Sequence, residues 1–188
     1  MAPNLDEKPS SATEVGHFTQ NMCQERRKLY IFGYGSLIWW PNISYTRSWF
    51  GYIKGYKRRF YQGTTTHRGT QQNPGRVLTL LPSKNEEARV WGKAYEVDGA
   101  IQINSAIDSL AEREMILGGY SLKEVPFFPH RVVYENAKDQ QDYQASGFMR
   151  VFVYIAKPGN DQYLGKAPLE VQVSRVDGEV KWNSRLHC

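Results

Sequence analysis

The sequence predicts an α+β domain in which a curled or barrel-like β-sheet carries one main helix. Strand-like segments are spread over most of the 188 residues, whereas a single stretch in the middle of the chain, residues 100–117, has helical periodicity. The chain shows no internal repeat, and its length suffices for one domain with a hydrophobic core. Many strands with one central helix indicate the α+β class.

The strands expected before the helix follow a polar N-terminal stretch. Residues 1–27 contain Pro, Ser and Asn and are expected to form a flexible tail. Residues 45–62 are rich in Tyr, Trp, Phe and Arg, and the KRRFYQG segment (57–63) is expected to form a strand with a basic face. Strands are expected at residues 29–34, 57–63, 76–81 and 89–97, with turns at 73–75 and 82–87. The fourth of these strands carries apolar residues at both parities, so both of its faces are expected to be covered.

Two further strands are expected after the helix. Residues 123–128 (KEVPFF) are expected to form an edge strand, because Pro126 has no backbone N–H to donate to a neighbouring strand. A polar loop is expected at 135–147. Residues 149–156 (MRVFVYIA) are apolar at nearly every position, which predicts a central strand.

Composition and charge limit the classes of protein to which this chain could belong. The chain has no run of eighteen apolar residues and no secretory signal, and it has only two cysteines, so we expect an intracellular, cytoplasmic protein with reduced thiols. The net charge is +5, and ten Lys or Arg residues against two acids lie between Arg47 and Lys93. This basic span could attract a nucleic acid or a small acidic metabolite, or it could be a solvated face.

A glycine-rich loop follows the first expected strand in the sequence LYIFGYGSLIWW (29–40). A dinucleotide-binding fingerprint would need glycine at position 38, which is Ile38. No Gly-Lys-Ser/Thr follows, and Ser36 is not in a G-x-S-x-G nucleophile elbow. No Cys/His cluster predicts a metal site. The loop therefore offers mainly backbone N–H groups.

One carboxylate of the expected helix lies on its apolar side. The helix is expected from Ala100 to a stop at the glycine pair 118–119, and Ile103, Ile107 and Leu110 form its apolar row. The next step of four residues reaches Glu114. Burial would raise the pKa of this carboxyl and suit it to proton transfer, or the side chain could instead reach water or pair with an arginine. His67 is a further candidate in a loop.

Six ordered motifs resemble the ChaC family, the glutathione-specific gamma-glutamylcyclotransferases. They cover most of the chain between residues 29 and 170: FGYGSLIW (32–39), GYKRRFYQGTTTHRG (55–69), PGRVLTL (74–80), VWGKAYEV (90–97), EREMILGGY (112–120) and YLGKAPLE (163–170). The resemblance implies a gamma-glutamylcyclotransferase-like small mixed β-barrel with flanking helices at 28–170. It also implies a cofactor-free cytosolic lyase that converts reduced glutathione to 5-oxoproline and Cys-Gly.

The resemblance also implies the site residues. Its catalytic glutamate corresponds to Glu114, which the helical period marks independently. Its substrate loop corresponds to Gly33, Tyr34, Gly35, Ser36, Leu37 and Ile38. Gly35 could permit close approach of a ligand or only a tight turn. Arg76 is a candidate for a carboxylate contact, and Tyr34 and Tyr154 could line the pocket or pack in the core.

The C-terminal residues 171–188 depart from the family. Members of the family continue with a helical segment that contains Gly-x-Asn-x-x-Tyr, whereas the 18 residues after Glu170 lack this motif and show little helical periodicity. We expect an atypical, shortened C-terminus that leaves the pocket open on one side and lowers activity and stability.

Two other functions remain open from the sequence. The first is a catalytically impaired relative that only binds gamma-glutamyl compounds. The second is a nucleic-acid-binding module, in which the basic span would supply charge and aromatic residues would stack on bases. The candidate stacking residues are Trp39, Trp40, Tyr52, Tyr56 and Phe60. A carboxylate at Glu114 favours the enzyme, because nucleic-acid binding does not need it. Oligomeric state is not predicted.

Overall fold

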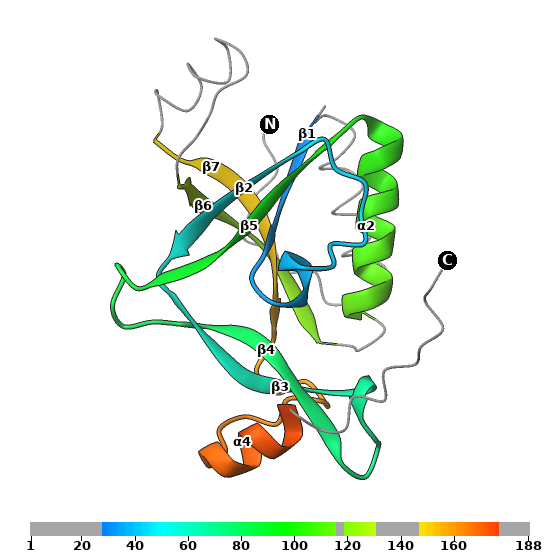
Figure 1. The fold of residues 1–188 in the computed structure, drawn as a ribbon, viewed down its shortest axis with the longest axis vertical. Helices are drawn as coiled ribbons and strands as arrows, with labels where there is room; N and C mark the ends of the chain where they lie inside the picture. Colours follow the sequence, from blue (N-terminus) through cyan, green and yellow to red (C-terminus); the bar gives the residue numbers. More distant parts are fainter. Residues whose placement is uncertain (1–27, 116–118, 131–146, 177–188) are drawn as a thin grey trace, which may run out of the picture.

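The structure is a computed structural model that describes residues 28–115, 119–130 and 147–176, with the backbone alone at 66–68, 111–115 and 176. The expected N-terminal tail, nearly all of the expected polar loop and residues 177–188 lie outside the described residues. Within the described part, five strands form a closed barrel, and a two-stranded hairpin and two α-helices lie around it (Figure 1). Neither of these helices is long and apolar enough to cross a membrane.

The barrel confirms the fold class that the sequence predicts. Neighbouring strands are antiparallel, except that the first and last strands run parallel and close the barrel through Ile31 and Phe152. In spatial order the strands are β1 (Lys28–Gly33), β5 (Arg89–Asp98), β2 (Arg47–Lys54), β6 (Tyr120–Pro129) and β7 (Met149–Ala156).

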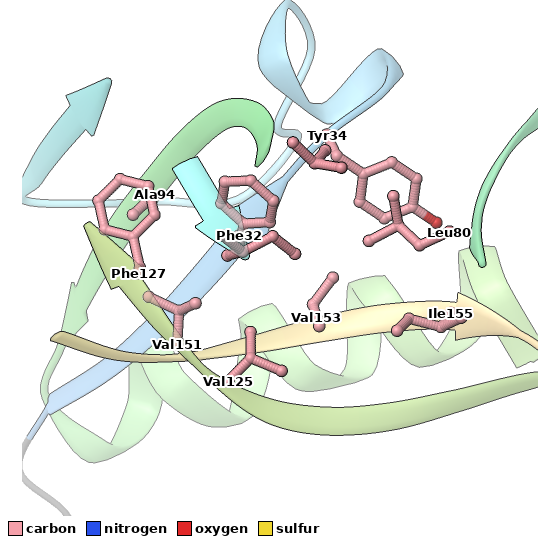
Figure 2. Packing of buried hydrophobic residues seen from close by; sticks show 11 residues of the cluster. Phe32, Tyr34, Leu80, Ala94, Val125, Phe127, Val151, Val153 and Ile155 are labelled. Carbon is pink, nitrogen blue, oxygen red and sulfur yellow. The ribbon is translucent and has the colours of Figure 1, made fainter. Parts of the chain in front are cut away.

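Alternate residues of β7 divide between two hydrophobic cores. Val151, Val153 and Ile155 belong to the barrel interior, where Figure 2 shows them beside Val125, Phe127 and Phe32. Phe152 and Tyr154 belong to a second core on the outside of the barrel. Burial of each such side chain contributes roughly 1.5–3 kcal/mol. A strand buried on both faces is apolar throughout, which explains why residues 149–156 have the sequence of a central strand.

Helix α2 (Ala100–Met115) covers the second core. Its buried side chains Ile103, Ala106 and Leu110 recur at helical spacing and pack in one cluster with residues of β1, β5 and β7. The helix begins directly after Gly99, which has φ 91° and accepts a hydrogen bond from the N–H of Ile103. The expected helix is confirmed as far as Met115, and residues 116–118 lie outside the described part.

The strand expected at 57–63 is confirmed as part of β3, and a separate strand, β2, precedes it in the same aromatic-rich segment. Gly55 adopts φ 78°, a left-handed conformation that glycine accepts at little cost and that interrupts a strand. The strand β2 therefore ends at Lys54 and stays in the barrel. The following strand β3 (Tyr56–Gly69) leaves the barrel and pairs with β4 (Pro74–Pro82) as a separate antiparallel hairpin.

The expected edge strand at 123–128 is wrong, because β6 has neighbours on both sides. It pairs with β7 from Tyr120 to Phe127 and with β2 through residues 127–129. The pairing with β2 stops at Phe127, so Pro126 lies just beyond the part of β6 that has two partner strands. The proline is therefore locally at an edge within a closed barrel.

The expectation of little helical structure after Glu170 is also wrong. Helix α4 (Leu169–Val176) follows Pro168, whose carbonyl accepts a hydrogen bond from the N–H of Gln172 at 3.0 Å. Figure 1 shows α4 against the β3–β4 hairpin, on the side away from α2. Leu169 and Val173 of this helix remain exposed.

A buried ion pair lies at the end of the barrel where β1 begins. Glu96 is 2% exposed, and its carboxylate accepts hydrogen bonds from Arg47 (2.9 and 3.2 Å), Thr46 (3.0 Å) and Tyr30 (3.0 Å). Burial by itself would raise the pKa of this carboxyl, but the hydrogen bonds together with the charge of Arg47 hold the pKa below its ordinary value. Glu96 is therefore a structural carboxylate.

Candidate functional site

The glycine-rich loop lies at the opposite end of the barrel, where β1 ends at Gly33. The backbone turns there into the short 3₁₀ helix η1 (Ser36–Ile38). A Cβ atom at Gly33 would lie 2.8 Å from the Cβ of Leu37, which is closer than such atoms approach. Glycine at position 33 therefore allows the chain to fold back on itself directly after the strand.

The hydrogen bonds of the loop leave its N-terminal amides available. The N–H of Ile38 donates to the carbonyl of Gly35 at 3.0 Å, and those of Trp39 and Trp40 donate to Ser36 at 3.0 and 2.9 Å. The N–H groups of Gly35 and Leu37 donate to no residue of the described part. The first N–H groups of a helix have no partner within it and carry partial positive charge, which suits them to an oxyanion.

Tyr95 in β5 holds the other end of this helix. Its hydroxyl donates to the carbonyl oxygens of Leu37 at 2.7 Å and Ile38 at 3.1 Å. Because carbonyl and amide groups point to opposite ends of a helix, this contact directs the amides of η1 away from Tyr95. Burial, with a smaller effect from Tyr45, raises the pKa of the Tyr95 hydroxyl to about 12, so it remains a donor throughout the neutral range.

The helix that carries Glu114 returns to the same end of the barrel. It begins beside the start of β1 and spans about 24 Å over its 16 residues. Leu110 packs in one cluster with Leu37 of the loop, and Figure 1 shows the last turns of α2 at the level of η1. Glu114 lies one helical turn beyond Leu110 in the same row. Its side chain lies outside the described residues.

An open cavity of about 470 Å³ lies between the β3–β4 hairpin and α4. It is lined by Arg58, Arg59, Phe60, Leu78 and Gln172. A Cβ at Gly35 would lie 3.7 Å from the Cβ of Leu78, so the loop and the cavity meet at this leucine. That distance is an ordinary contact, and the protein itself therefore does not require glycine at position 35 for space.

The other site residues expected from the sequence differ in how deeply they are buried. Tyr34 is 7% exposed and packs in the barrel core, where its hydroxyl donates to the carbonyl of Tyr154 at 2.9 Å; Tyr154 itself is 9% exposed. Ser36 is exposed, whereas Leu37 is buried. The expectation that His67 lies in a loop is wrong, because its backbone belongs to β3; its side chain lies outside the described residues. Among the residues that the structure does describe, no group of His, Cys, Asp and Glu could hold a metal ion.

Sequence reasoning did not single out Tyr95 or Glu96. Both lie in the run AYEV, where four consecutive residues are buried. A polar side chain inside such a run is a signal that could have been used, because a buried carboxyl or hydroxyl needs a hydrogen-bond partner. The partners themselves lie more than forty residues away along the chain, so the sequence pattern does not reveal them.

Comparisons with known proteins agree with this fold. A family model described as ChaC-like protein matches residues 29–179. The human protein named glutathione-specific gamma-glutamylcyclotransferase 1 is 41% identical over 175 residues, which cover 93% of this chain and 72% of the relative. Its mouse counterpart is 45% identical over 174 residues, covering 93% and 69%. A crystal structure of a glutathione-specific gamma-glutamylcyclotransferase from yeast aligns with a TM-score of 0.66 at 25% identity, covering 79% of this chain and 77% of that one.

The protein has the gamma-glutamylcyclotransferase fold, with a closed barrel, the Gly33–Ile38 loop and the helix α2. The chain belongs to the ChaC-like protein family. The resemblance seen in the six sequence motifs is thereby confirmed.

Proposed function

We propose that this protein is a glutathione-specific gamma-glutamylcyclotransferase that releases 5-oxoproline and Cys-Gly from reduced glutathione. The observation that carries the proposal is that Leu37 of the Gly33–Ile38 loop and Leu110 of α2 belong to one hydrophobic cluster. This cluster places the loop near the end of α2 that carries Glu114. The names of the human and mouse relatives support the substrate and the reaction. The proposal also places the protein in the cytoplasm and takes reduced glutathione as its substrate.

The reaction demands little from the enzyme beyond orientation and proton transfer. The α-amino nitrogen of the gamma-glutamyl unit attacks its own side-chain amide carbon, and a five-membered lactam forms as the C–N bond to cysteine breaks. Well-oriented intramolecular attacks reach effective molarities of about 10⁵–10⁸ M. Folding the substrate into the attacking conformation is therefore a large part of the catalysis.

Glu114 is proposed to move the protons. The ammonium group must lose a proton before it attacks, and the departing cysteine nitrogen must gain one. A single carboxylate within reach of both nitrogens can act first as general base and then as general acid. The position of Glu114 supports this role, because it continues the buried row Ile103, Ala106 and Leu110.

The loop is proposed to stabilise the oxyanion that forms as the amide carbon becomes tetrahedral. The amides of Gly35 and Leu37 are the candidate donors, since neither has a partner within the described residues. Loss of one such donor typically costs about 10²–10³ in rate. Gly35 has open space beside its Cα apart from Leu78, which supports close approach of a substrate to the loop.

A nucleic-acid module is less well supported. The ring of Tyr52 is stacked on Phe128 and meets Trp91 edge-on, and Tyr56 packs against the barrel core. These side chains are therefore occupied by contacts within the protein and do not form a free stacking platform. Of the five aromatic candidates, Trp39 and Trp40 are largely exposed, at 76% and 72%.

One experiment tests the proposal directly. The purified protein is incubated with reduced glutathione, and 5-oxoproline is measured. We expect product from the wild type and a loss of about 10²–10⁴-fold in Glu114→Gln, the range for removal of an acid/base group. Asp108→Asn, an exposed position on the same helix, is the matched control and should keep the wild-type rate. An unchanged rate in Glu114→Gln would contradict the mechanism. Absence of product from the wild type would favour the alternative hypothesis of an impaired relative that only binds gamma-glutamyl compounds.

A further inference from the structure

Four arginines gather where the β3–β4 hairpin meets α4. Arg58 and Arg59 line the cavity there, Arg76 lies on β4, and Arg175 lies on α4 close enough to lower the pKa of Arg76. None of the four forms an ion pair with a carboxylate of the described residues. Only Arg76 among them is buried, so its uncompensated charge is costly, whereas Arg59 is exposed and Arg58 and Arg175 are partly exposed.

Arg76 is the most deeply buried of them, at 3% exposed. Its Nη1 donates to the carbonyl oxygens of Phe60 and Gly165, both at 2.7 Å, whereas its Nε is buried without a hydrogen-bond partner. Neutral carbonyl groups hold this guanidinium in place but leave its charge uncompensated. Burial, followed by repulsion from Arg175, lowers its pKa, which indicates that a neighbouring negative charge would stabilise it.

Arg58 and Arg59 retain donors that point to no described partner. A guanidinium has five N–H donors. Arg58 uses its Nη2 on the carbonyl oxygen of Trp91, and Arg59 uses its Nη1 on the carbonyl of Arg58 at 2.6 Å. Both residues line the cavity, and the remaining donors of their guanidinium groups can form charge-assisted hydrogen bonds with a carboxylate bound there.

The cavity lies within reach of a peptide held by the loop. Leu78 lines the cavity and lies 3.7 Å from the position that a Cβ of Gly35 would take. In glutathione, cysteine and glycine separate the amide that is cleaved from the terminal carboxylate, and two extended residues span about 7 Å. A volume of about 470 Å³ is in the ordinary range for a small-molecule pocket.

We propose that this cavity is the subsite for the C-terminal carboxylate of the peptide substrate, with Arg58 and Arg59 as its contacts. Arg76 and Arg175 supply positive potential behind it. The inference rests on the proposed function and deepens it, because it makes the free glycine carboxylate a determinant of specificity. A gamma-glutamyl compound without that carboxylate would leave the guanidinium groups unpaired and would react more slowly.

The first test compares glutathione with its glycyl ethyl ester, in which the terminal charge is removed. We expect the wild type to favour glutathione by about 10–100-fold in kcat/KM, the value of one or two charge-assisted hydrogen bonds. In Arg59→Gln the preference should fall toward unity. Arg89→Gln is the control, because Arg89 is an exposed arginine that lies over the ring of Tyr52 and does not line the cavity. It should keep the wild-type preference. Equal use of the two substrates by the wild type, or an unchanged preference in Arg59→Gln, would overturn the proposal.

A second test needs no turnover and therefore separates the subsite from the proposed function. The S-methylated dipeptide Cys-Gly cannot be cyclised, and its binding is measured by calorimetry beside that of its C-terminal amide and of inorganic phosphate. The proposal requires binding of the free dipeptide, weaker binding of the amide by about tenfold or more, and loss of the difference in Arg59→Gln. If the dipeptide fails to bind, or phosphate binds as tightly, the assignment to a peptide carboxylate is wrong even if the enzyme cleaves glutathione.

Discussion

The hydroxyl of Tyr95 lies 2.7 Å from the carbonyl oxygen of Leu37, although 58 residues separate them along the chain. This contact joins strand β5 to the short helix of the glycine loop, and a second contact to Ile38 at 3.1 Å shares the same donor. Because Tyr95 is 1% exposed, its ring is fixed by packing and its hydroxyl has a defined position. The orientation of the loop amides therefore depends on a side chain outside the loop.

Tyr95→Phe should reduce kcat by on the order of 10²-fold with little change in KM, because a displaced loop would no longer meet the oxyanion. The ring and its packing are retained, so the free energy of unfolding should fall by only about 1 kcal/mol, the net value of a buried hydrogen bond. Steady-state kinetics and chemical denaturation measure the two effects. Tyr30→Phe is the matched control, since it loses a hydroxyl bonded to Glu96 at the other end of the barrel. If both variants keep full activity, Tyr95 does not position the loop.

Substitution of the two loop glycines should distinguish an effect on stability from an effect on substrate binding. Gly33→Ala places a methyl group 2.8 Å from the Cβ of Leu37, so the loop must shift, at a cost of about 1–3 kcal/mol in stability together with lost activity. Gly35→Ala meets only Leu78 at 3.7 Å and should leave stability nearly unchanged. Its activity should nevertheless fall if substrate approaches the backbone there. Thermal unfolding and the 5-oxoproline assay report the two quantities, and equal destabilisation by both substitutions would refute this distinction.

Glu96 should make stability depend on acidic pH. The pKa of Glu96 is lower in the folded protein than its ordinary 4.5, so folding favours the ionised form. Its contribution is therefore complete above about pH 4.5 and is lost as the pH falls through the lowered pKa. Glu96→Gln should cost about 3 kcal/mol at pH 7, since it leaves Arg47 without its carboxylate. The difference from wild type should shrink in denaturation experiments at pH 3.

The control for this measurement is Glu87→Gln. Glu87 pairs with Lys54 at 2.7 Å, but its side chain is 68% exposed, and exposed ion pairs contribute little because solvent screens them. The variant should be as stable as the wild type at pH 7. A pH-independent difference between wild type and Glu96→Gln would show that the lost contacts, and not the charge, carry the effect.

Much of this protein follows from local patterns in its sequence. The strands at 29–34, 76–81, 89–97 and 149–156 and the helix from Ala100 are confirmed, because hydrophobic periodicity depends only on neighbouring residues. The six motifs correctly indicate the family. The roles of Glu114 and of the Gly33–Ile38 loop remain predictions from the motifs and from helical period.

The errors arose where the outcome depends on distant parts of the chain. Pro126 suggested an edge strand, but β2 and β7 pair with β6 from both sides. The pattern at 57–63 correctly predicts a strand, but not that β3 pairs with β4 outside the barrel while β2 stays in it. The helix α4 has exposed apolar residues, and its packing on the hairpin was not visible in its own sequence.

The sequence by itself therefore determined the elements, the family and the two segments proposed to carry the chemistry. Only the tertiary structure decided that these segments lie close together. Leu37 and Leu110 belong to one hydrophobic cluster, Tyr95 holds the loop carbonyls, and Leu78 joins the loop to the arginine-lined cavity. The physical reason is the distance along the chain over which each interaction acts. Backbone periodicity is set within a few residues, whereas the closed barrel depends on pairing between strands that lie far apart in the chain, up to the pairing of Ile31 with Phe152.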